Sequence, residues 1–394
     1  MTAVDWALIA VHGLIVYSWI LFPVLLAILG RRGSPPSAGE PEPDRTPHVA
    51  FVLSAYNEED CIRDRIRNLL ELDYPRTRWR AYIGVDGSKD RTGSEAMAAA
   101  AGQESIRVFD FAENRGKVAV LKDLVLQANA AIPAPEILAF TDANIVFAPN
   151  ALRHFCRPFS DPAVGGVCGK LSFTKGEGSE TEENVYWRIE NWLKARESAI
   201  DSCLGANGAI YAIRSSLFWK EIPSNTIIDD FVIGMKVREQ NYRMVYEPRA
   251  VATEELPSQI KDEWKRRVRI GAGDFQALRL CAPCLKPSKG AFAWLFWSHK
   301  VLRWFTPHLM LAGVLLAGIS ALQSESWLGP FFLALYAGFG IAALLGRSRM
   351  RKGRLMQILR GIQYLLTMQT AIFAGFVRFC RGNLEGRWQR SSRP

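Results

Sequence analysis

The feature that most limits the fold of this chain is an uninterrupted apolar segment near its start. From Ala7 to Gly30 the sequence ALIAVHGLIVYSWILFPVLLAILG contains no Asp, Glu, Lys or Arg over 24 residues. About 20 apolar residues are enough for a helix to cross a hydrocarbon core about 30 Å thick. Residues 1–30 are therefore predicted to hold an N-terminal transmembrane helix. A signal peptide is the alternative, but no basic residue precedes the segment and no small-residue cleavage site follows it.

The residues after this helix predict its orientation. Arg31 and Arg32 follow the apolar segment directly. Because positively charged flanks favour the cytoplasmic side, we expect the start of the chain outside and the region after Gly30 in the cytosol. The expected location is the inner (plasma) membrane, crossed more than once. Seven scattered cysteines favour reduced thiols, which agrees with a cytosolic region.

The net charge of +10 lies in one part of the chain. Arg347 to Pro394 contain eleven Lys and Arg residues and one acid, Glu385, which accounts for the whole excess. Basic residues interleaved with apolar helices are typical of contact with anionic lipid headgroups, whereas a DNA-binding protein would carry them on its soluble domain. The lipid bilayer is therefore an expected partner, and nucleic acid is not.

The middle of the chain has the pattern of one soluble α/β domain. Residues 31–47 are rich in Pro, Gly and charge and predict a linker, which leaves 48–288 as the domain. Strand-like runs at 48–54, 79–85, 106–111 and 136–141 alternate with helical patterns at 59–72 and 117–131. This alternation predicts a mostly parallel, Rossmann-like sheet with crossover helices, which binds ligands at the carboxyl ends of its strands.

The C-terminal part is again apolar. Residues 289–304 mix Trp and Phe with Lys and Arg, which predicts a helix in the membrane interface. Residues 305–380 are predicted to form transmembrane or interfacial helices, with two clear spans at 305–322 and 327–346. The segment 361–379 either crosses the membrane or lies in the interface. Residues 381–394 form a basic tail.

Acidic residues lie at the ends of the predicted strands. Asp86 follows the second strand, Asp142 and Asn144 follow the strand at 136–141, and Asp229 and Asp230 begin a helical pattern. Two oxygen-bearing side chains two residues apart on an extended loop suit a hard cation such as Mg²⁺ or Mn²⁺. Each position has a plainer alternative, namely an Asx turn, a turn cap or an acid at a helix N-terminus.

Six motifs, in one order, resemble a known enzyme family. They are VLSAYNEE (52–59), VDGSKDRT (85–92), NRGK (114–117), TDAN (141–144), GANGAIYAIR (205–214) and IDDF (228–231). Together they resemble a membrane-integrated family 2 glycosyltransferase of the cellulose synthase, hyaluronan synthase and poly-N-acetylglucosamine synthase superfamily, from about residue 48 to 280. The resemblance implies a GT-A fold and inverting, metal-dependent transfer from a UDP-sugar in exopolysaccharide synthesis.

The resemblance also implies a role for individual residues. Asp230 would be the general base, and Asp142 with Asn144 would bind Mg²⁺ or Mn²⁺. The donor nucleotide would be bound by Ala55, Tyr56, Glu58, Asp86, Lys117 and Asp142. The acceptor side would be lined by Asn207, Gly208, Trp187 and Asp229.

Two positions depart from the family pattern. The second Asp of the usual metal motif is Asn144, which keeps a ligand oxygen and loses a charge. The QxxRW signature aligns with residues 266–270, where Arg269 is retained, Arg266 replaces Gln and Ile270 replaces Trp. Ile offers no stacking face to an acceptor sugar, which puts processive polymerisation in question. Arg266 and Arg269 remain suited to binding a diphosphate.

A helical stretch before the GANGAIYAIR motif carries aromatic and acidic residues. Trp187 and Trp192 lie near Glu190 and Glu197 in sequence. These side chains are expected either to hold an acceptor sugar or to form one packed face of an amphipathic helix.

Several alternatives to a polymerising transferase stay open. The chain is either a polymerase or a transferase that adds one sugar to a lipid or lipid-linked acceptor. A glycoside hydrolase using Asp142 and Asp230 is a different class, although the basic residues fit a phosphate leaving group better. A non-catalytic membrane scaffold is the third class. The sugar, the saccharide or glycolipid acceptor, and a secretion partner or homo-oligomer are not determined by the sequence.

Overall fold

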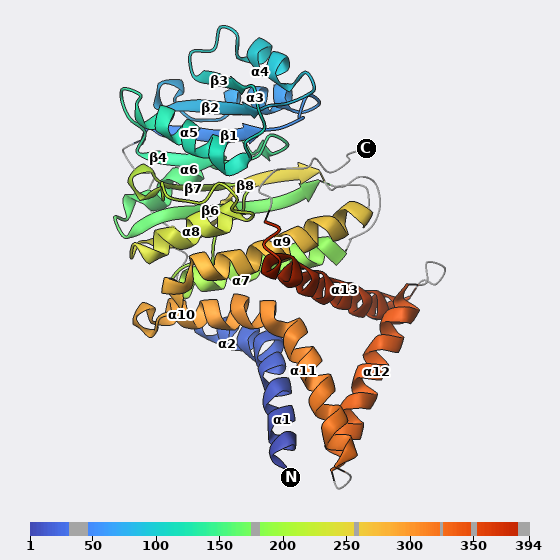
Figure 1. Cartoon of the computed structure of the whole chain (residues 1–394). Coiled ribbons are helices and arrows are strands. Elements are labelled where there is room, and N and C mark those ends of the chain that lie inside the picture. Colours follow the sequence, from blue (N-terminus) through green and yellow to red (C-terminus); the bar gives the residue numbers. More distant parts are fainter. Residues whose placement is uncertain (31–45, 175–181, 256–259, 324–325, 348–352, 385–394) are drawn as a thin grey trace.

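The computed structural model describes residues 1–30, 46–174, 182–255, 260–323, 326–347 and 353–384. Most of the predicted linker, 31–47, and of the predicted basic tail, 381–394, therefore lies outside the described residues. A sheet domain, a middle layer of helices and a group of apolar helices follow one another in Figure 1, from top to bottom. The catalytic region proposed from sequence thus sits on a helical base.

The described strands form one eight-stranded sheet in the order β3-β2-β1-β4-β7-β6-β8-β5. The strands are β1 (Val49–Ala55), β2 (Trp79–Asp86), β3 (Ile106–Phe111), β4 (Ile137–Phe140), β5 (Val146–Phe147), β6 (Val164–Thr174), β7 (Tyr211–Arg214) and β8 (Arg243–Glu255). The first four pair in parallel, as the alternating pattern predicts. The predicted α/β class with a mostly parallel sheet is confirmed.

The second half of the sheet contains antiparallel pairs that the local pattern did not predict. Strand β7 pairs antiparallel with both β4 and β6, and β5 pairs antiparallel with β8. Strands β6 and β8 are parallel to each other. These pairings place the loop after β4 beside the end of β8, more than a hundred residues later in the chain.

Helices cover both faces of the sheet. The helices of the sheet domain are α3 (Ile62–Leu70), α4 (Thr92–Ala100), α5 (Lys117–Asn129), α6 (Ala151–Cys156), α7 (Glu182–Ile200) and α8 (Asp229–Glu239). Helices α3, α4 and α6 bury apolar residues in one core cluster. Helices α5, α7 and α8 contribute to a second cluster, which also contains Phe22 and Leu26 of the N-terminal helix. The core of the sheet domain is therefore continuous with the helical base.

Among the described residues, three helices are long and apolar enough to cross a membrane: Ala3–Leu29, Ala291–Leu322 and Leu328–Gly346. The first comprises α1 (Ala3–Val16), a π-helical segment and α2 (Phe22–Leu29). The second comprises α10 (Ala291–Leu295), the π-helical segment η7 (Phe296–Val301) and α11 (Leu302–Leu322), and the third is α12 (Leu328–Gly346). The segment expected to be a separate interfacial helix, 289–304, is thus largely continuous with the first predicted C-terminal span.

The remaining long helices lie between the sheet and the apolar helices. Helix α13 (Arg354–Cys380) packs along α9 (Ile260–Leu280), as Figure 1 shows in dark red and orange. A Cβ atom at Gly375 would lie 2.6 Å from the backbone nitrogen of Ala272, so the two backbones nearly touch. The Phe275 and Phe376 rings pack edge to face beside this crossing, with centroids 4.9 Å apart. This packing fixes α13 against α9, and the placement of 361–379 across or along the membrane stays a prediction.

Candidate active site

A lysine and three acids meet at the carboxyl ends of the parallel strands. Lys117 begins α5, Asp142 follows β4, and Asp229 and Asp230 begin α8. The Lys117 Nζ lies 2.8 Å from Asp142 Oδ1 and 3.8 Å from Asp229 Oδ2. This is the sheet edge where ligands bind in open α/β folds. The structure therefore brings together residues that are more than a hundred positions apart in sequence.

Charge is unevenly balanced in this cluster. Burial opposes the charge on Lys117, but Asp142, Asp229 and Asp230 outweigh burial and raise the pKa of the ammonium. Burial raises the pKa of Asp229 to about 6, against the opposing effect of Lys117, and raises the pKa of Asp230 in the same direction. One cation thus faces three carboxyl groups, which leaves the site attractive to further positive charge.

Asp229 has unused hydrogen-bonding capacity. Within the described part of the chain, its Oδ2 is buried and accepts no hydrogen bond. The Lys117 ammonium lies 3.8 Å from this oxygen, which is an ion pair but is beyond hydrogen-bond distance. The oxygen can therefore still accept a hydrogen bond from a ligand.

Asp230 lies against the backbone of the GANG segment. Burial has the largest effect and raises the pKa of its carboxylate, while the backbone at Phe231 and Gly208 opposes this change. A Cβ atom at Gly208 would lie 3.0 Å from Asp230 Oδ2, so only glycine lets the backbone approach this closely. The neighbouring Asn207 is 7 % exposed, and its Nδ2 has no hydrogen-bond partner among the described residues. The GANG segment and the IDDF segment therefore form one wall of the site.

Asp86 supports the turn that carries Lys117. It is 2 % exposed and accepts the N–H groups of Arg115 at 2.8 Å and Gly116 at 2.9 Å. Gly116 has φ +90°, a conformation that favours glycine. Asp86 is thus linked through Gly116 to Lys117 and from there to Asp142, so the predicted acids share one site.

The first predicted donor loop lies beside Asp86. Ala55 ends β1, is buried and pairs with Val85, while Tyr56 is half-buried in the turn that follows. Glu58 is 1 % exposed; its N–H donates to Thr92 Oγ1 at 2.7 Å, and its Oε2 accepts from the Cys61 thiol at 3.1 Å. The structure thus gives Glu58 partners within the loop.

Arginines approach the acids from the helical base. Arg269 lies on α9, and burial lowers its pKa, with Asp229 and Asp230 opposing this change. Arg266 and Arg378 lower the pKa of Arg269 further. Arg378 belongs to α13, and its Nε donates to the Asn383 carbonyl oxygen at 2.9 Å. The positive charge that acts on Arg269 therefore comes from α13 as well as from α9.

The oxygen ligands at the predicted metal position fit a hard cation in part. Asp142 offers a carboxylate, and Asn144 an amide whose Nδ2 donates to Glu254 Oε1 at 2.9 Å. Among the described residues no group of three or more His, Cys, Asp or Glu is arranged to hold a metal. Mg²⁺ and Mn²⁺ sites with one or two protein oxygens are commonly completed by substrate phosphates and water. The residues therefore fit such a cation when a diphosphate accompanies it.

The aromatic and acidic side chains of α7 contact different parts of the chain. The Trp187 ring packs against Phe173 on β6, with ring centroids 5.5 Å apart. Glu190 Oε2 accepts from Lys300 at 3.1 Å, and Glu197 binds His299, both on η7. For Glu190 and Glu197 the packed-face interpretation therefore agrees with the structure, because they join α7 to an apolar helix.

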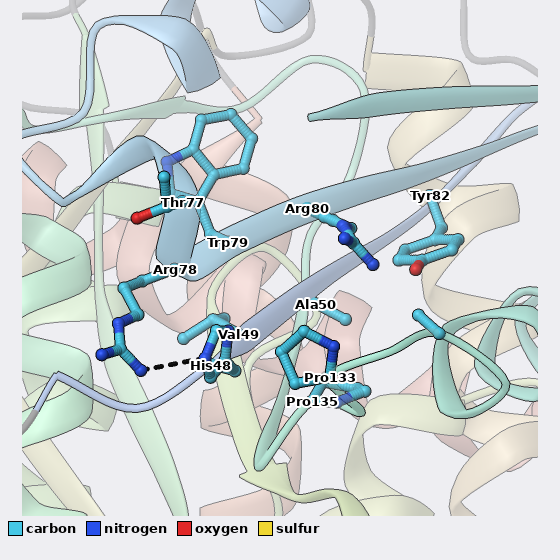
Figure 2. Close-up of a pocket in the computed structure, with 11 residues that line it drawn as sticks. His48, Val49, Ala50, Thr77, Arg78, Trp79, Arg80, Tyr82, Pro133 and Pro135 are labelled. Atoms are coloured by element: carbon cyan, nitrogen blue, oxygen red, sulfur yellow. Dashed lines mark hydrogen bonds between the residues drawn. The ribbon is translucent and has the colours of Figure 1, made fainter. Parts of the chain in front are cut away.

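A small cavity lies at the opposite end of the strands. Figure 2 shows it beside His48 and Arg78, which are hydrogen-bonded at 2.9 Å and precede β1 and β2. Its volume of about 20 Å³ is close to that needed for one water molecule. The cavity is therefore not part of the candidate active site.

Comparisons with known proteins agree on one family. The family model described as Glycosyltransferase like family 2 matches residues 47–273. A poly-beta-1,6-N-acetyl-D-glucosamine synthase of Staphylococcus epidermidis is 26 % identical over 250 residues, which are 61 % of this chain and 58 % of the relative. The synthase of Staphylococcus aureus strain MSSA476 is 25 % identical over 60 % of this chain and 56 % of its own length. The matched region thus spans less than two thirds of these relatives.

One solved structure shares the fold over almost the whole chain. It is a mannosyltransferase from Pyrobaculum calidifontis in complex with GDP-Man and Mn²⁺. The TM-score is 0.67 at 20 % identity, with 96 % of this chain and 98 % of that chain covered. The likeness includes the sheet domain and the helical base together.

Proposed function

The chain belongs to glycosyltransferase family 2, and from that premise we propose that it transfers a sugar from a UDP-sugar to a saccharide acceptor at a membrane, in exopolysaccharide synthesis. The cluster of Lys117 with Asp142, Asp229 and Asp230 carries this proposal. The names of the staphylococcal synthases support the product class, and the GDP-Man complex of the mannosyltransferase supports a nucleoside diphosphate sugar as donor.

The proposed reaction is a single displacement with inversion at the anomeric carbon. Asp230 takes the proton of the acceptor hydroxyl, the acceptor oxygen forms a bond to the anomeric carbon, and the bond to the diphosphate oxygen breaks. The electron pair leaves with UDP. The close approach of the Gly208 backbone to the Asp230 carboxylate helps to fix the carboxylate in position for the proton.

The basic residues of the site serve the leaving diphosphate. Asp142 and Asn144 would hold Mg²⁺ or Mn²⁺, which when bound neutralises negative charge on the diphosphate. Lys117 lies next to Asp142 and binds the same phosphate region, and Arg266 and Arg269 approach from α9. Ala55, Tyr56, Glu58 and Asp86 form the nucleotide side, and Asn207, Gly208, Asp229 and Trp187 the acceptor side.

The membrane arrangement is part of the proposal. Arg31 and Arg32, together with the basic run after α12, favour a cytosolic sheet domain in the inner membrane. Because the sheet-domain core contains Phe22 and Leu26, the site is held at a fixed height above the bilayer.

A second candidate function is transfer of one sugar to a lipid or lipid-linked acceptor. Ile270 favours it, because this position on α9 offers no aromatic face for a growing chain. A hydrolase has less support, since Lys117 and Arg269 suit a phosphate leaving group.

Product analysis on the purified full chain tests the proposal. A panel of UDP-sugars and GDP-mannose is assayed for nucleotide release with membrane lipid and acceptor, with and without EDTA. We expect UDP release from one UDP-sugar, new glycosidic product and loss of both with EDTA. Long product supports the polymerase, and a single added sugar supports the second candidate. No nucleotide release from any donor contradicts both.

A further inference from the structure

Glu254 contacts the residue that departs from the family's metal motif. The Asn144 Nδ2 donates to Glu254 Oε1 at 2.9 Å, although the two residues are 110 positions apart. The antiparallel pairing of Val146 with Thr253 brings the loop after β4 and the end of β8 to the same place. The pairing of β5 with β8 therefore brings Asn144 and Glu254 into contact.

The direction of this hydrogen bond fixes the Asn144 amide. An ionised carboxylate accepts and cannot donate, so the amide nitrogen must face Glu254 and the amide oxygen must face elsewhere. Along 141–147, Thr141 and Ala143 are buried while Asp142 and Asn144 are partly exposed. Ala143 and Asn144 form a turn before β5, and Asp142 and Asn144 are the partly exposed side chains at this turn.

An unrestrained amide at this position would be a poor ligand. Rotation by 180° about the last side-chain bond replaces the oxygen with an NH₂ group, which repels a cation. An Asp would not have this weakness, because both of its terminal atoms are oxygens. The Asn that stands in the metal motif therefore needs a partner that selects one amide orientation.

We propose that Glu254 is a positioning residue for the cation site, holding Asn144 so that its amide oxygen faces a divalent cation beside Asp142. This rests on the proposed function, because Asn144 is a ligand only if the site binds Mg²⁺ or Mn²⁺. Partners of metal ligands that fix their orientation commonly change metal affinity about 10–100-fold when removed.

Mn²⁺ binding to the purified full chain with UDP tests this role, read from the electron paramagnetic resonance signal of free Mn²⁺. Glu254→Ala is expected to weaken Mn²⁺ affinity about tenfold. Glu254→Gln keeps an oxygen acceptor but adds an NH₂ donor, so its Mn²⁺ affinity is expected to lie between those of the unmodified protein and Glu254→Ala. Glu104→Ala, an exposed acid on a distant loop, is the control for loss of one negative charge.

The decisive comparison repeats Glu254→Ala in an Asn144→Asp background. A carboxylate needs no orientation, so Glu254→Ala should no longer weaken Mn²⁺ binding there. Equal weakening in both backgrounds overturns the proposal, as does unchanged affinity in the Glu254→Ala single variant. Absence of Mn²⁺ binding by the unmodified protein overturns the metal site itself, and with it this inference. If Glu254→Ala alone lowers the thermal unfolding midpoint, the proposal is judged from Glu254→Gln and from Glu254→Ala in the Asn144→Asp background.

Discussion

The Lys117 Nζ lies 2.8 Å from Asp142 Oδ1, which joins the first residue of α5 to the loop after β4. The same ammonium is 3.8 Å from Asp229 Oδ2, so one cation joins the acid proposed for the donor side to the acid proposed for the acceptor side. Because three carboxyl groups surround it, the site is organised before a donor or divalent cation arrives.

Lys117→Met should disable the enzyme. The change removes the cation that partly offsets burial at Asp229 and Asp230, and it removes a contact to the donor phosphates. We expect kcat/KM for UDP release to fall about 100-fold. Lys122→Met is the matched control, since this lysine lies on the same helix and reaches the Ile222 carbonyl instead. Equal loss in both variants would contradict a specific role for Lys117.

The pH dependence follows from the raised pKa of the acid pair. Burial raises the pKa of Asp229 to about 6 and shifts that of Asp230 upward as well. A group with a raised pKa stays protonated to a higher pH, and the proposed base must be ionised to accept a proton. We expect kcat/KM to rise as the acid pair ionises, at a pH above the ordinary range of an aspartate, and then to level off. A profile that is flat from about pH 5 to 8, with an intact fold throughout, would contradict this.

Gly208→Ala should act on chemistry more than on folding. The added Cβ atom would lie 3.0 Å from Asp230 Oδ2 and push the carboxylate from its position. We expect kcat to fall about tenfold with the affinity for UDP retained. Gly361→Ala on α13 is the control, because no atom lies within 4 Å of its new Cβ. An unchanged kcat in Gly208→Ala would contradict the expectation that the close approach of Gly208 positions the Asp230 carboxylate.

Gly375→Leu should uncouple α13 from α9. Its Cβ atom would lie 2.6 Å from backbone atoms of Gly271 and Ala272, so the helices must separate. Overpacking of this kind typically costs about 1–3 kcal/mol, which a lower thermal unfolding midpoint would reveal. Since Arg269 lies on α9, UDP affinity should fall as well. Gly361→Leu, which enters open space, should change neither quantity.

Much of the fold could be predicted because its signals are local. The alternation of strands and helices from 48 to 141 follows from apolar periodicity, and the strand-end rule then placed Asp86 and Asp142 at one edge. The structure agrees, with Asp86 linked through Gly116 to Lys117 and Asp142. The sequence pattern marked Asp229 and Asp230 as paired acids at a helix start, and the family motifs gave Asp230 its expected role and added Gly208.

The rest depends on contacts between distant segments. The antiparallel pairs of β7 and β5 leave no local signature, so the Asn144–Glu254 contact could not be read from the sequence. The charge of Arg378 acts on Arg269 because α13 crosses α9 at Gly375. The sequence left Glu190 and Glu197 between sugar ligands and a packed helix face, because their pairing with His299 and Lys300 depends on how η7 packs on α7.

The most direct test of the central claim is Asp230→Asn, assayed for sugar transfer and for UDP binding in the same preparation. Asn keeps the shape of the side chain and cannot take the acceptor proton at neutral pH. We expect transfer to fall about 1,000-fold or more while the dissociation constant for UDP changes less than about twofold. Transfer at the unmodified rate would show that Asp230 is not the base and that the acids at this sheet edge do not perform the chemistry.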